Sequence, residues 1–322
     1  MVDFPLRMQR FLSFGFGLTL TTCRSDPQSE GDTFSTLLPW LNFRHFLDGS
    51  TVGTMGTVGT VGIEVGATFS KPREVPRRRE LSLEIYQKEF EGQIPVVVEG
   101  AYDEMPCLKD GWIEENIMKP FKDERVVFTG HKENEDRIMG TKLKTFLKNV
   151  NKNSQSAWSY LRDEFFLHRH PHLITSCPPL PPFLKNQDQF ALMPLKFMPP
   201  NATLLWGGRY SRSKLHVDSY NWTGTNVVIC GEKYFRLIPP GHDEMLEVVT
   251  KRCHMALECV SYESTNDLFE KAVPPGLVKV LWETKLQKGD ALIIPSGWWH
   301  QAVNLGTTLA MAWNLRWDAD IS

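Results

Sequence analysis

Residues 215–219 read Leu-His-Val-Asp-Ser, and residues 297–300, far along the chain, read Gly-Trp-Trp-His. Side chains two positions apart in a β-strand point to the same face of the sheet. A strand over residues 215–219 would therefore direct His216 and Asp218 to one side, where a later strand could add His300. Two imidazoles and one carboxylate form the facial triad that holds iron(II) and leaves three coordination positions open. The spacing thus predicts a metal site of the kind used for oxygen chemistry.

The stretch before His300 indicates how its side chain is held. Residues 286–300 read Leu-Gln-Lys-Gly-Asp-Ala-Leu-Ile-Ile-Pro-Ser-Gly-Trp-Trp-His. This order predicts a Gly-Asp turn, an apolar strand, a Pro-Ser-Gly turn and a second strand near the histidine. A histidine held just past a tight turn and backed by two large aromatic residues has its position fixed by the backbone, which metal ligation requires. Because consecutive strand residues face opposite sides, we expect Trp298 and Trp299 to be scaffold rather than a substrate cage.

Lys233 is the third feature with a chemical meaning. It opens the apolar stretch 233–238, Lys-Tyr-Phe-Arg-Leu-Ile. A lysine in such a place is usually a surface charge, but a lysine that faced the interior of a barrel would need an anionic partner. A dicarboxylate co-substrate would supply that partner.

From residue 203 onward, short apolar stretches alternate with turn residues, a pattern typical of all-β sandwiches and barrels. Strands are predicted over residues 203–206, 214–218, 226–230, 234–238, 278–282, 291–294, 301–304 and 308–315. We therefore predict a mainly β fold with a double-stranded β-helix core, the jelly-roll arrangement of cupins. Residues 241–271 form a charged insertion between strands, which we expect to be partly helical.

The segment before this core mixes helical and strand-like patterns. Helices are predicted over residues 81–90, 112–120 and 142–152, and strands over residues 94–98 and 125–129. The folded domain is therefore predicted to span residues 81–322, with an α/β lead-in at its N-terminal end.

Residues 1–80 are predicted to be a low-complexity, disordered N-terminal extension. Residues 24–80 are dominated by Ser, Thr, Gly and Pro, and residues 51–62 repeat a Thr-x-Gly triplet that offers few side chains for a core. The basic cluster at residues 71–79 is compatible with a nuclear-import signal, although an exposed charged linker is the commoner explanation. The apolar run at residues 11–20 loosely resembles a targeting segment, but no cleavage site follows it, which favours a plain extension.

The composition and net charge of the chain indicate which partners and which cellular compartment to expect. The formal net charge of −2 gives no reason to expect sequence-independent nucleic-acid binding. No run is long and apolar enough to span a bilayer, so we expect no membrane partner. The six cysteines lack CxxC pairing and a chain of 322 residues needs no disulfide, which favours the nucleus or cytoplasm, with N-terminal organelle targeting left open. A zinc site built from Cys253, His254 and Cys259 is an alternative whose spacing matches no common finger.

Taken together, these motifs resemble the Jumonji C family of Fe(II)- and 2-oxoglutarate-dependent oxygenases. The similarity rests on Ser213-x-x-His216-x-Asp218, Gly231-x-Lys233, residues 289–300 and Asn304-Leu-Gly-Thr-Thr-Leu-Ala-Met-Ala-Trp-Asn314. It runs from about residue 86 to residue 317, and its motifs are strong from residue 213 onward. Within the family the chain is most similar to the small hydroxylase branch that includes the lysyl hydroxylase once named the phosphatidylserine receptor.

The resemblance implies Fe(II) as cofactor and 2-oxoglutarate as co-substrate. The residues that would bind the metal are His216, Asp218 and His300. Those that would bind 2-oxoglutarate are Ser213, Asn226, Lys233 and Asn314, with Lys233 pairing with the far carboxylate. Two positions depart from the family pattern. Ala312 stands where a relative has threonine, which puts one co-substrate contact in doubt, and Trp222 occupies an unfamiliar place near the mouth.

The resemblance further implies hydroxylation of a protein side chain, lysyl or similar, with O2 consumed and succinate and CO2 released. One alternative is an N-methyl demethylase of a histone or other protein. We expect hydroxylation, because Ala310, Ala312 and Asn314 offer a roomy face without an aromatic cage, and Trp222 is the only aromatic candidate nearby. Two further alternatives are a catalytically weak module that only binds protein, which should have lost a ligand, and a cupin metalloenzyme without 2-oxoglutarate, which would not need Lys233.

Overall fold

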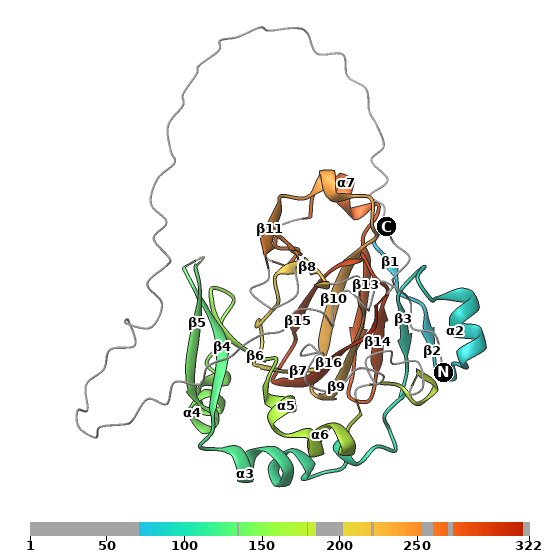
Figure 1. Cartoon of the computed structure of the whole chain (residues 1–322). Coiled ribbons are helices and arrows are strands. Elements are labelled where there is room, and N and C mark those ends of the chain that lie inside the picture. Colours follow the sequence, from blue (N-terminus) through green and yellow to red (C-terminus); the bar gives the residue numbers. More distant parts are fainter. Residues whose placement is uncertain are drawn as a thin grey trace, which may run out of the picture. The chain divides into compact units, whose positions relative to one another are not determined.

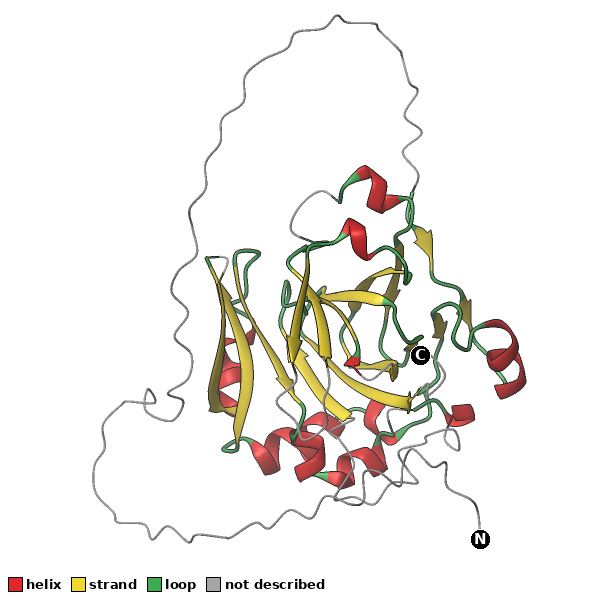
Figure 2. Cartoon of the chain, turned by 45° about the horizontal axis from the view of Figure 1, so that its top comes forward, coloured by secondary structure: helices red, strands yellow, loops and turns green. Residues whose placement is uncertain are grey.

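Two β-sheets form the framework of the domain (Figures 1 and 2). The computed structural model describes residues 71–133, 135–178, 180–184, 202–219, 222–252, 260–269 and 273–317. The predicted N-terminal extension up to residue 70, including its apolar run, lies outside the described residues, and so do the candidate zinc residues Cys253, His254 and Cys259.

The sheets have seven and nine strands. The first follows the order β1 (Arg73–Glu74), β13 (Trp282–Leu286), β10 (Lys233–Ile238), β15 (Trp299–Asn304), β8 (Leu215–Val217), β12 (Val260–Ser264) and β11 (Val248–Arg252). The second follows the order β2 (Arg77–Arg78), β3 (Val96–Val98), β14 (Ala291–Ile294), β9 (Trp222–Cys230), β16 (Thr308–Trp317), β7 (Ala202–Gly207), β6 (Ala157–Asp163), β4 (Arg125–Lys132) and β5 (Glu135–Lys142). Only the β1–β13 and β2–β3 pairs of these described strands are parallel.

The chain changes sheet with almost every strand of the core. Strands β7, β9, β14 and β16 belong to the second sheet, whereas β8, β10, β13 and β15, which alternate with them along the chain, belong to the first. Such alternation produces a jelly roll. The predicted mainly β, double-stranded β-helix fold is therefore confirmed.

Buried apolar side chains from both sheets fill one end of the space between them. Phe235 of β10 and Ala302 of β15 cluster with Val228 of β9 and Leu292 of β14. Side chains at every second position of a strand face the partner sheet, which is why these positions are apolar. Burial of one such large side chain contributes about 1.5 to 3 kcal/mol. The site described below lies beside this cluster.

Short helices pack against the outer face of the nine-stranded sheet (Figure 2). They are η2 (Pro106–Leu108), the π-helical turn η3 (Glu114–Met118), α3 (Lys119–Phe121), α4 (Leu143–Val150), α5 (Phe166–Arg169) and α6 (Pro171–Ser176). Phe146 of α4 and Leu173 of α6 share a buried cluster with Leu161 of β6 and Trp206 of β7. The predicted helices at residues 112–120 and 142–152 are confirmed in η3, α3 and α4, as are the strands at 94–98 and 125–129 in β3 and β4.

Helix α2 (Leu83–Glu89) confirms the helix predicted at residues 81–90. Its start is set by Ser82, whose hydroxyl accepts the Ile85 N–H at 3.2 Å. A serine at this position satisfies one of the free N–H groups of the first turn. A further 3-10 turn, η4 (Pro182–Leu184), falls in the proline-rich stretch that precedes β7.

Strand structure begins before residue 81, contrary to the predicted boundary. Within the basic cluster at residues 71–79, β1 and β2 pair with β13 and β3, and Val75 between them is buried. Arg77 donates to Glu99 at 2.6 Å and to Asp290 at 2.8 Å. The interpretation of this cluster as an exposed linker is therefore wrong. Strands of two residues are too short to produce a periodic pattern in the sequence.

The strand predicted over residues 278–282 is also wrong. These residues end helix α7 (Pro275–Val278) and form a turn, and β13 begins only at Trp282. Pro275 occupies the first helical turn, where its fixed φ favours a helix.

The insertion at residues 241–271 extends the first sheet. Its described part contains the 3-10 turn η8 (Asp243–Met245) and the hairpin of β11 and β12. Strand β12 pairs with β8, the strand that carries His216. The expected helical content is confirmed only for η8, and the two strands were not predicted.

Cys107 and Cys177 are disulfide-bonded, with Cα atoms 5.3 Å apart. The bond joins η2 to the end of α6, and both residues are buried in the core. This bond was therefore not predicted by the expectation that a chain of this length needs no disulfide. The partners are 70 residues apart and share no motif, so the pairing could not be derived from their spacing.

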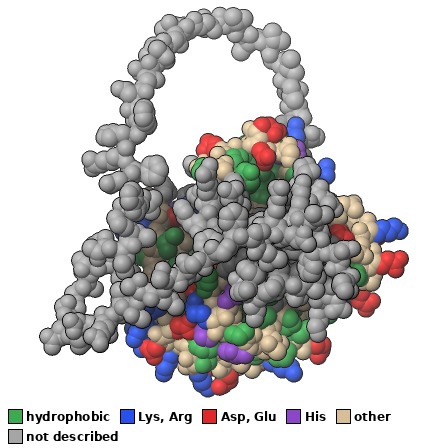
Figure 3. All heavy atoms as spheres, in the orientation of Figure 1, with side chains coloured by type: hydrophobic (Ala, Val, Ile, Leu, Met, Phe, Trp, Pro, Cys, Tyr) green, Lys and Arg blue, Asp and Glu red, His purple; other side chains and the backbone are tan. Residues whose placement is uncertain are grey.

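None of the described helices is long and apolar enough to cross a membrane. On the described surface visible in Figure 3, Lys and Arg are interspersed with Asp and Glu rather than gathered in a patch of one sign. This mixture agrees with the absence of a basic surplus in the composition.

Candidate active site

His216, Asp218 and His300 come together where β8 and β15 run side by side. His216 lies directly opposite His300 in the antiparallel pair, and Asp218 is the first residue after β8. Asp218 Oδ1 is 3.7 Å from His216 Nε2 and 3.8 Å from His300 Nε2. One ligand atom from each residue lies within 4.8 Å of the others. The three side chains are therefore close enough to surround one metal ion.

Both imidazole rings are oriented by backbone carbonyl groups. His216 Nδ1 is 2.8 Å from the carbonyl oxygen of Lys214, and His300 Nδ1 is 3.1 Å from that of Trp298. A carbonyl oxygen only accepts hydrogen bonds, so each Nδ1 carries the hydrogen and each Nε2 keeps its lone pair. Metal-binding histidines are commonly oriented in this way. Both Nε2 atoms lie within 3.8 Å of the same carboxylate oxygen, a proximity that suits a shared cation.

The electrostatic environment keeps His216 neutral. The pKa of His216 is lowered to about 3, by burial in the first place and by the neighbouring His300 in the second, whereas Asp218 opposes the shift. A neutral imidazole is the form that binds metals. The histidine is therefore ready to act as a ligand at physiological pH.

A pocket of about 300 Å³ extends from the triad into the space between the two sheets. All seven predicted site residues line it: Ser213, His216, Asp218, Asn226, Lys233, His300 and Asn314. The residues come from β8, β10 and β15 of the first sheet and from β9 and β16 of the second, or lie within two positions of the ends of these strands. The jelly roll thus brings together residues that are up to 101 positions apart, from 213 to 314.

Lys233 lies deep in this pocket and is only 2% exposed. Its Nζ donates to Tyr160 Oη at 3.0 Å and lies over the rings of Tyr160 and Phe235, at 5.6 Å and 5.4 Å from their centroids. Burial lowers the pKa of Lys233 to about 7, and no carboxylate among the described residues counteracts this shift. The pocket therefore contains a buried amine, and no carboxylate among the described residues neutralises its charge when it is protonated.

Ser213 is tied to β15 through three hydrogen bonds. Its N–H donates to the carbonyl of Ala302 at 3.1 Å, its Oγ accepts the Ala302 N–H at 3.1 Å, and its carbonyl accepts from Gln301 Nε2 at 2.9 Å. Because the hydroxyl oxygen already accepts one bond, its hydrogen is available to donate to a ligand in the pocket.

The three asparagines considered in the sequence have different surroundings. Asn226 is 7% exposed and lines the pocket, and its Oδ1 makes no hydrogen bond. Asn314 also lines the pocket, opposite Gly224 of β9. Asn304 does not line it and donates instead to Ser211 Oγ at 3.0 Å. Asn304 is thus a structural residue, whereas an unpaired buried amide at Asn226 leaves a hydrogen-bonding group for a ligand.

Ala312, which departs from the family pattern, lies opposite Thr203 of β7 and Asn226 of β9. Thr203 also lines the pocket. A hydroxyl group is therefore present on the neighbouring strand, one cross-strand step from the position where a relative has threonine. Neither Thr203 nor Tyr160 was predicted as a site residue, because neither belongs to a recognisable motif.

The mouth of the pocket has two aromatic residues and two carboxylates. Trp222 is buried, whereas Tyr262 of β12 is 45% exposed. Glu263 of β12 lies directly opposite His216, and Glu164 follows β6. The expectation that Trp222 is the only aromatic residue nearby is therefore wrong, because the insertion contributes Tyr262.

Gly224 allows the close approach of the Asp218 carboxylate. A Cβ atom at Gly224 would lie 2.5 Å from Asp218 Oδ2. Only glycine leaves room for this contact without a shift of the aspartate. Strand β9 thereby helps to fix the orientation of the candidate ligand.

Comparisons with known proteins agree with this geometry. Residues 82–321 match the family described as Cupin-like domain. The chain is 27% identical over 244 residues to the lysine-specific demethylase JMJ21 of Arabidopsis thaliana, covering 74% of this chain and 25% of that protein. It is 24% identical over 239 residues to the bifunctional arginine demethylase and lysyl-hydroxylase psr-1 of Caenorhabditis elegans, covering 73% and 58%.

A third similarity is to the 2-oxoglutarate and iron-dependent oxygenase JMJD4 of Danio rerio, 31% identical over 120 residues, which covers 34% of this chain and 25% of that protein. The chain thus spans less than two thirds of the length of these relatives. Their names bear out the family resemblance, the enzyme class and the cofactor pair predicted from the sequence. These names include demethylation for JMJ21 and both demethylation and lysyl hydroxylation for psr-1, so they do not distinguish the two products.

Proposed function

This chain belongs to the Cupin-like domain family, and from that premise we propose that it is an Fe(II)- and 2-oxoglutarate-dependent oxygenase that hydroxylates a protein side chain. Iron(II) and 2-oxoglutarate, when bound, supply with O2 an oxidant strong enough to break a C–H bond, and succinate and CO2 are released.

One observation carries the proposal. The His216, Asp218 and His300 triad lines the same pocket as Lys233, a buried lysine that has no carboxylate partner among the described residues. His216, Asp218 and His300 would hold the metal through Nε2, a carboxylate oxygen and Nε2. Lys233 lies on the neighbouring strand β10 and would bind the far carboxylate of a dicarboxylate. A buried cation is stable only when it is paired. A dicarboxylate that reaches from the triad to Lys233 would bind at the metal with one end and pair with the lysine at the other.

The remaining polar groups of the pocket suit a bound carboxylate. Ser213 has a hydroxyl hydrogen free to donate, and Tyr160 is hydrogen bonded to Lys233. Asn226 has an unpaired amide oxygen, and a half-turn of this amide would present its NH2 group to a carboxylate. Apolar residues such as Leu205 and Ile294 complete the lining and keep the pocket poor in water.

We propose a cationic side chain, lysyl or similar, as the substrate group. Glu263 lies one cross-strand step from His216, and Glu164 lines the same mouth. Lys214 Nζ is 3.8 Å from Glu263, so an ammonium group already occupies this neighbourhood. Carboxylates near the mouth attract a basic side chain and repel an acidic one. The arginine demethylase and lysyl-hydroxylase psr-1, by its name, acts on basic residues as well.

Removal of an N-methyl group is the second candidate function. Trp222 and Tyr262 line the mouth, and aromatic residues can surround a methylated ammonium group. Hydroxylation remains our proposal, because it only requires a methylene near the metal. A module that only binds protein is disfavoured, because all three candidate ligands are present. A nuclear or cytoplasmic location stays a prediction that imaging of the tagged protein would test.

The test is mass spectrometry of lysine-containing peptides after incubation with the protein, Fe(II), 2-oxoglutarate and O2. We expect unmodified peptides to gain the mass of one oxygen atom, with one succinate formed per modified peptide. Loss of a methylene mass from methylated peptides, without oxygen gain on unmodified ones, would favour the demethylase instead. The same reaction without Fe(II) is the control.

A further inference from the structure

Both neighbours of His300 in β15 are hydrogen bonded to the insertion. Trp299 Nε1 donates to Asp243 Oδ1 at 2.5 Å, and Gln301 Oε1 accepts the Leu268 N–H at 2.7 Å. Consecutive strand residues face opposite sides, so Trp299 and Gln301 point away from the pocket that His300 faces. One candidate metal ligand is thus fixed on both sides by contacts made behind the strand.

Gln301 joins three segments of the chain and is only 1% exposed. Besides accepting from Leu268, its Nε2 donates to the carbonyl of Ser213 at 2.9 Å and to Asp267 Oδ1 at 3.2 Å. Ser213 lines the pocket, whereas Asp267 and Leu268 belong to the insertion. The oxygen and both hydrogens of the Gln301 amide are thus paired, and a buried amide with all its groups paired has a well-defined orientation.

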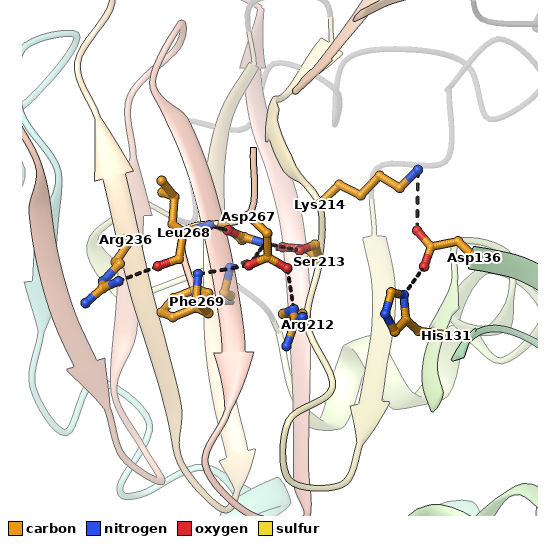
Figure 4. A network of polar contacts seen from close by, with 11 residues as sticks. His131, Asp136, Arg212, Ser213, Lys214, Arg236, Asp267, Leu268 and Phe269 are labelled. Carbon is orange, nitrogen blue, oxygen red and sulfur yellow. Dashed lines mark hydrogen bonds and ion pairs between the residues drawn. The ribbon is translucent and has the colours of Figure 1, made fainter. Parts of the chain in front are cut away.

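Asp267 and Leu268 have further partners in the first sheet and beside it. Asp267 Oδ2 accepts from Arg212 Nε at 2.6 Å, and the Arg212 side chain is 3% exposed. Arg236, which lies opposite Gln301 in the sheet, donates to the carbonyl of Leu268. Figure 4 shows Asp267 and Leu268 between Ser213, Arg212 and Arg236. The backbone of Leu268 is therefore bound on its N–H side and on its carbonyl side.

Apolar contacts reinforce these hydrogen bonds. Leu246 and Leu268 of the insertion are buried in one cluster with Leu215 and Trp299. Leu215 precedes His216, and Trp299 precedes His300. The insertion therefore packs behind both histidines of the triad.

We propose that these two segments, residues 243–246 and 266–269, form a brace that positions His300 and Ser213 and thereby sets the affinity of the site for its metal. Asp243, Asp267 and Gln301 act as positioning residues, since none of them lines the pocket. This inference rests on the proposed function, because it assumes that the triad binds a metal.

The physical reason is the precision that a metal site demands. A ligand has to be held within a fraction of an ångström, and residues that orient metal ligands change metal affinity by about 10- to 100-fold when replaced. β15 is already hydrogen bonded to β10 and β8, so loss of one brace contact should loosen its position without unfolding the sheet.

The experiment measures Co(II) binding by visible absorption, with the full chain and without co-substrate. Asp243→Ala removes the acceptor of Trp299, and Asp267→Ala removes the acceptor shared by Gln301 and Arg212. Asp243→Asn keeps an oxygen acceptor and is the conservative variant. Glu244→Ala is the matched control, because it removes the same charge from the adjacent exposed residue. Thermal unfolding is followed for each variant.

We expect Asp267→Ala to weaken Co(II) binding by about tenfold, and Asp243→Ala to weaken it in the same direction. Asp243→Asn and Glu244→Ala should bind like the wild type, and all variants should unfold cooperatively. Should Asp267→Ala fail to fold, the comparison of Asp243→Ala with Asp243→Asn decides alone.

Equal Co(II) affinity of the wild type and both alanine variants would overturn the brace. The brace would also be overturned if Glu244→Ala lost as much Co(II) affinity as the two brace variants, because the loss would then follow from the change in overall charge. If the wild type itself binds no Co(II), the proposed metal site fails and the brace fails with it, so the two failures are distinguishable.

Discussion

Lys233 is buried in a place where the described chain offers no counter-charge, and the protonation of Lys233 is therefore coupled to the binding of an anion. Burial lowers the pKa of Lys233 to about 7, whereas a bound carboxylate would raise it again. Below pH 7 the free pocket already contains the cation. Above pH 7 the lysine is neutral, and an anionic co-substrate has to bind together with a proton.

The apparent KM for 2-oxoglutarate should therefore rise as the pH increases above about 7, by up to about tenfold per pH unit. Lys233→Arg should show a flat profile over the same range, because a guanidinium group stays protonated. The measurement is succinate formation at several pH values for both proteins. Parallel profiles would contradict the assignment of this pH dependence to Lys233.

Removal of the lysine should weaken co-substrate binding more than metal binding. Lys233→Ala is expected to raise the KM for 2-oxoglutarate by the equivalent of about 2 to 5 kcal/mol, because one partner of a buried charge pair is lost. Its affinity for Co(II) should change little, since Lys233 is not one of the three residues whose ligand atoms come together at the candidate metal site. An unchanged KM would mean that another group binds the far carboxylate.

Glu263 should affect the substrate rather than the co-substrate. Glu263→Gln is expected to raise the KM for a lysine peptide about fivefold, because a partly exposed charge pair contributes about 1 kcal/mol. The KM for 2-oxoglutarate should stay the same, and Glu244→Gln should behave as the wild type. Equal activity of Glu263→Gln on the lysine peptide would remove Glu263 from the recognition of the cation.

The residues of the site differ in how far the sequence could predict them. His216, Asp218 and His300 could be predicted because metal chemistry restricts residue type and spacing. Tyr160 and Thr203 contribute through β6 and β7, where nothing in the local sequence distinguishes a pocket-lining tyrosine or threonine from a core residue. Their role depends on which strands become neighbours, and that is a property of the whole sheet.

At the scale of elements, strands with clear apolar runs were predicted closely. Residues 291–294 were predicted as a strand and form β14. Strand β5 was missed, because all but one of its side chains are exposed and its sequence shows no alternation. It is a strand because it pairs with β4, which a local pattern does not reveal.

The N-terminal limit of the domain gives a test at this scale. Deletion of residues 1–70 should leave folding and turnover unchanged, whereas deletion of residues 1–80 should lower the melting temperature. The longer deletion removes β1, β2, buried Val75 and the Arg77 contact to Asp290. Thermal unfolding of the two truncated proteins is the measurement.

A pair of point variants isolates one contact of this segment. Arg77→Ala should lower the melting temperature, because the Asp290 side chain is only 9% exposed and would lose its cation. Arg79→Ala, the exposed matched control, should not. For the deletions, equal melting temperatures of the proteins that lack residues 1–70 and residues 1–80 would show that β1 and β2 contribute nothing to the stability of the fold.

For the whole molecule, the sequence predicted the architecture but not the long-range contacts. Alternating short strands with turns were enough to predict a jelly roll. The Cys107–Cys177 bond and the packing of the insertion behind β15 were not predictable, since each joins segments that no local pattern relates. The same limit applies to substrate recognition, because the mouth combines Glu164, Trp222 and Glu263 from three different strands or their ends.

The central claim is that one pocket binds a metal at the triad and 2-oxoglutarate between the triad and Lys233. The most direct measurement is the visible charge-transfer absorption of the protein mixed with Fe(II) and 2-oxoglutarate without O2. We expect a band in the wild type and in the exposed control His172→Ala, and no band in His300→Ala, with cooperative unfolding in all three. Absence of the band in the wild type at saturating Fe(II) and 2-oxoglutarate, or its persistence in His300→Ala, would contradict the claim.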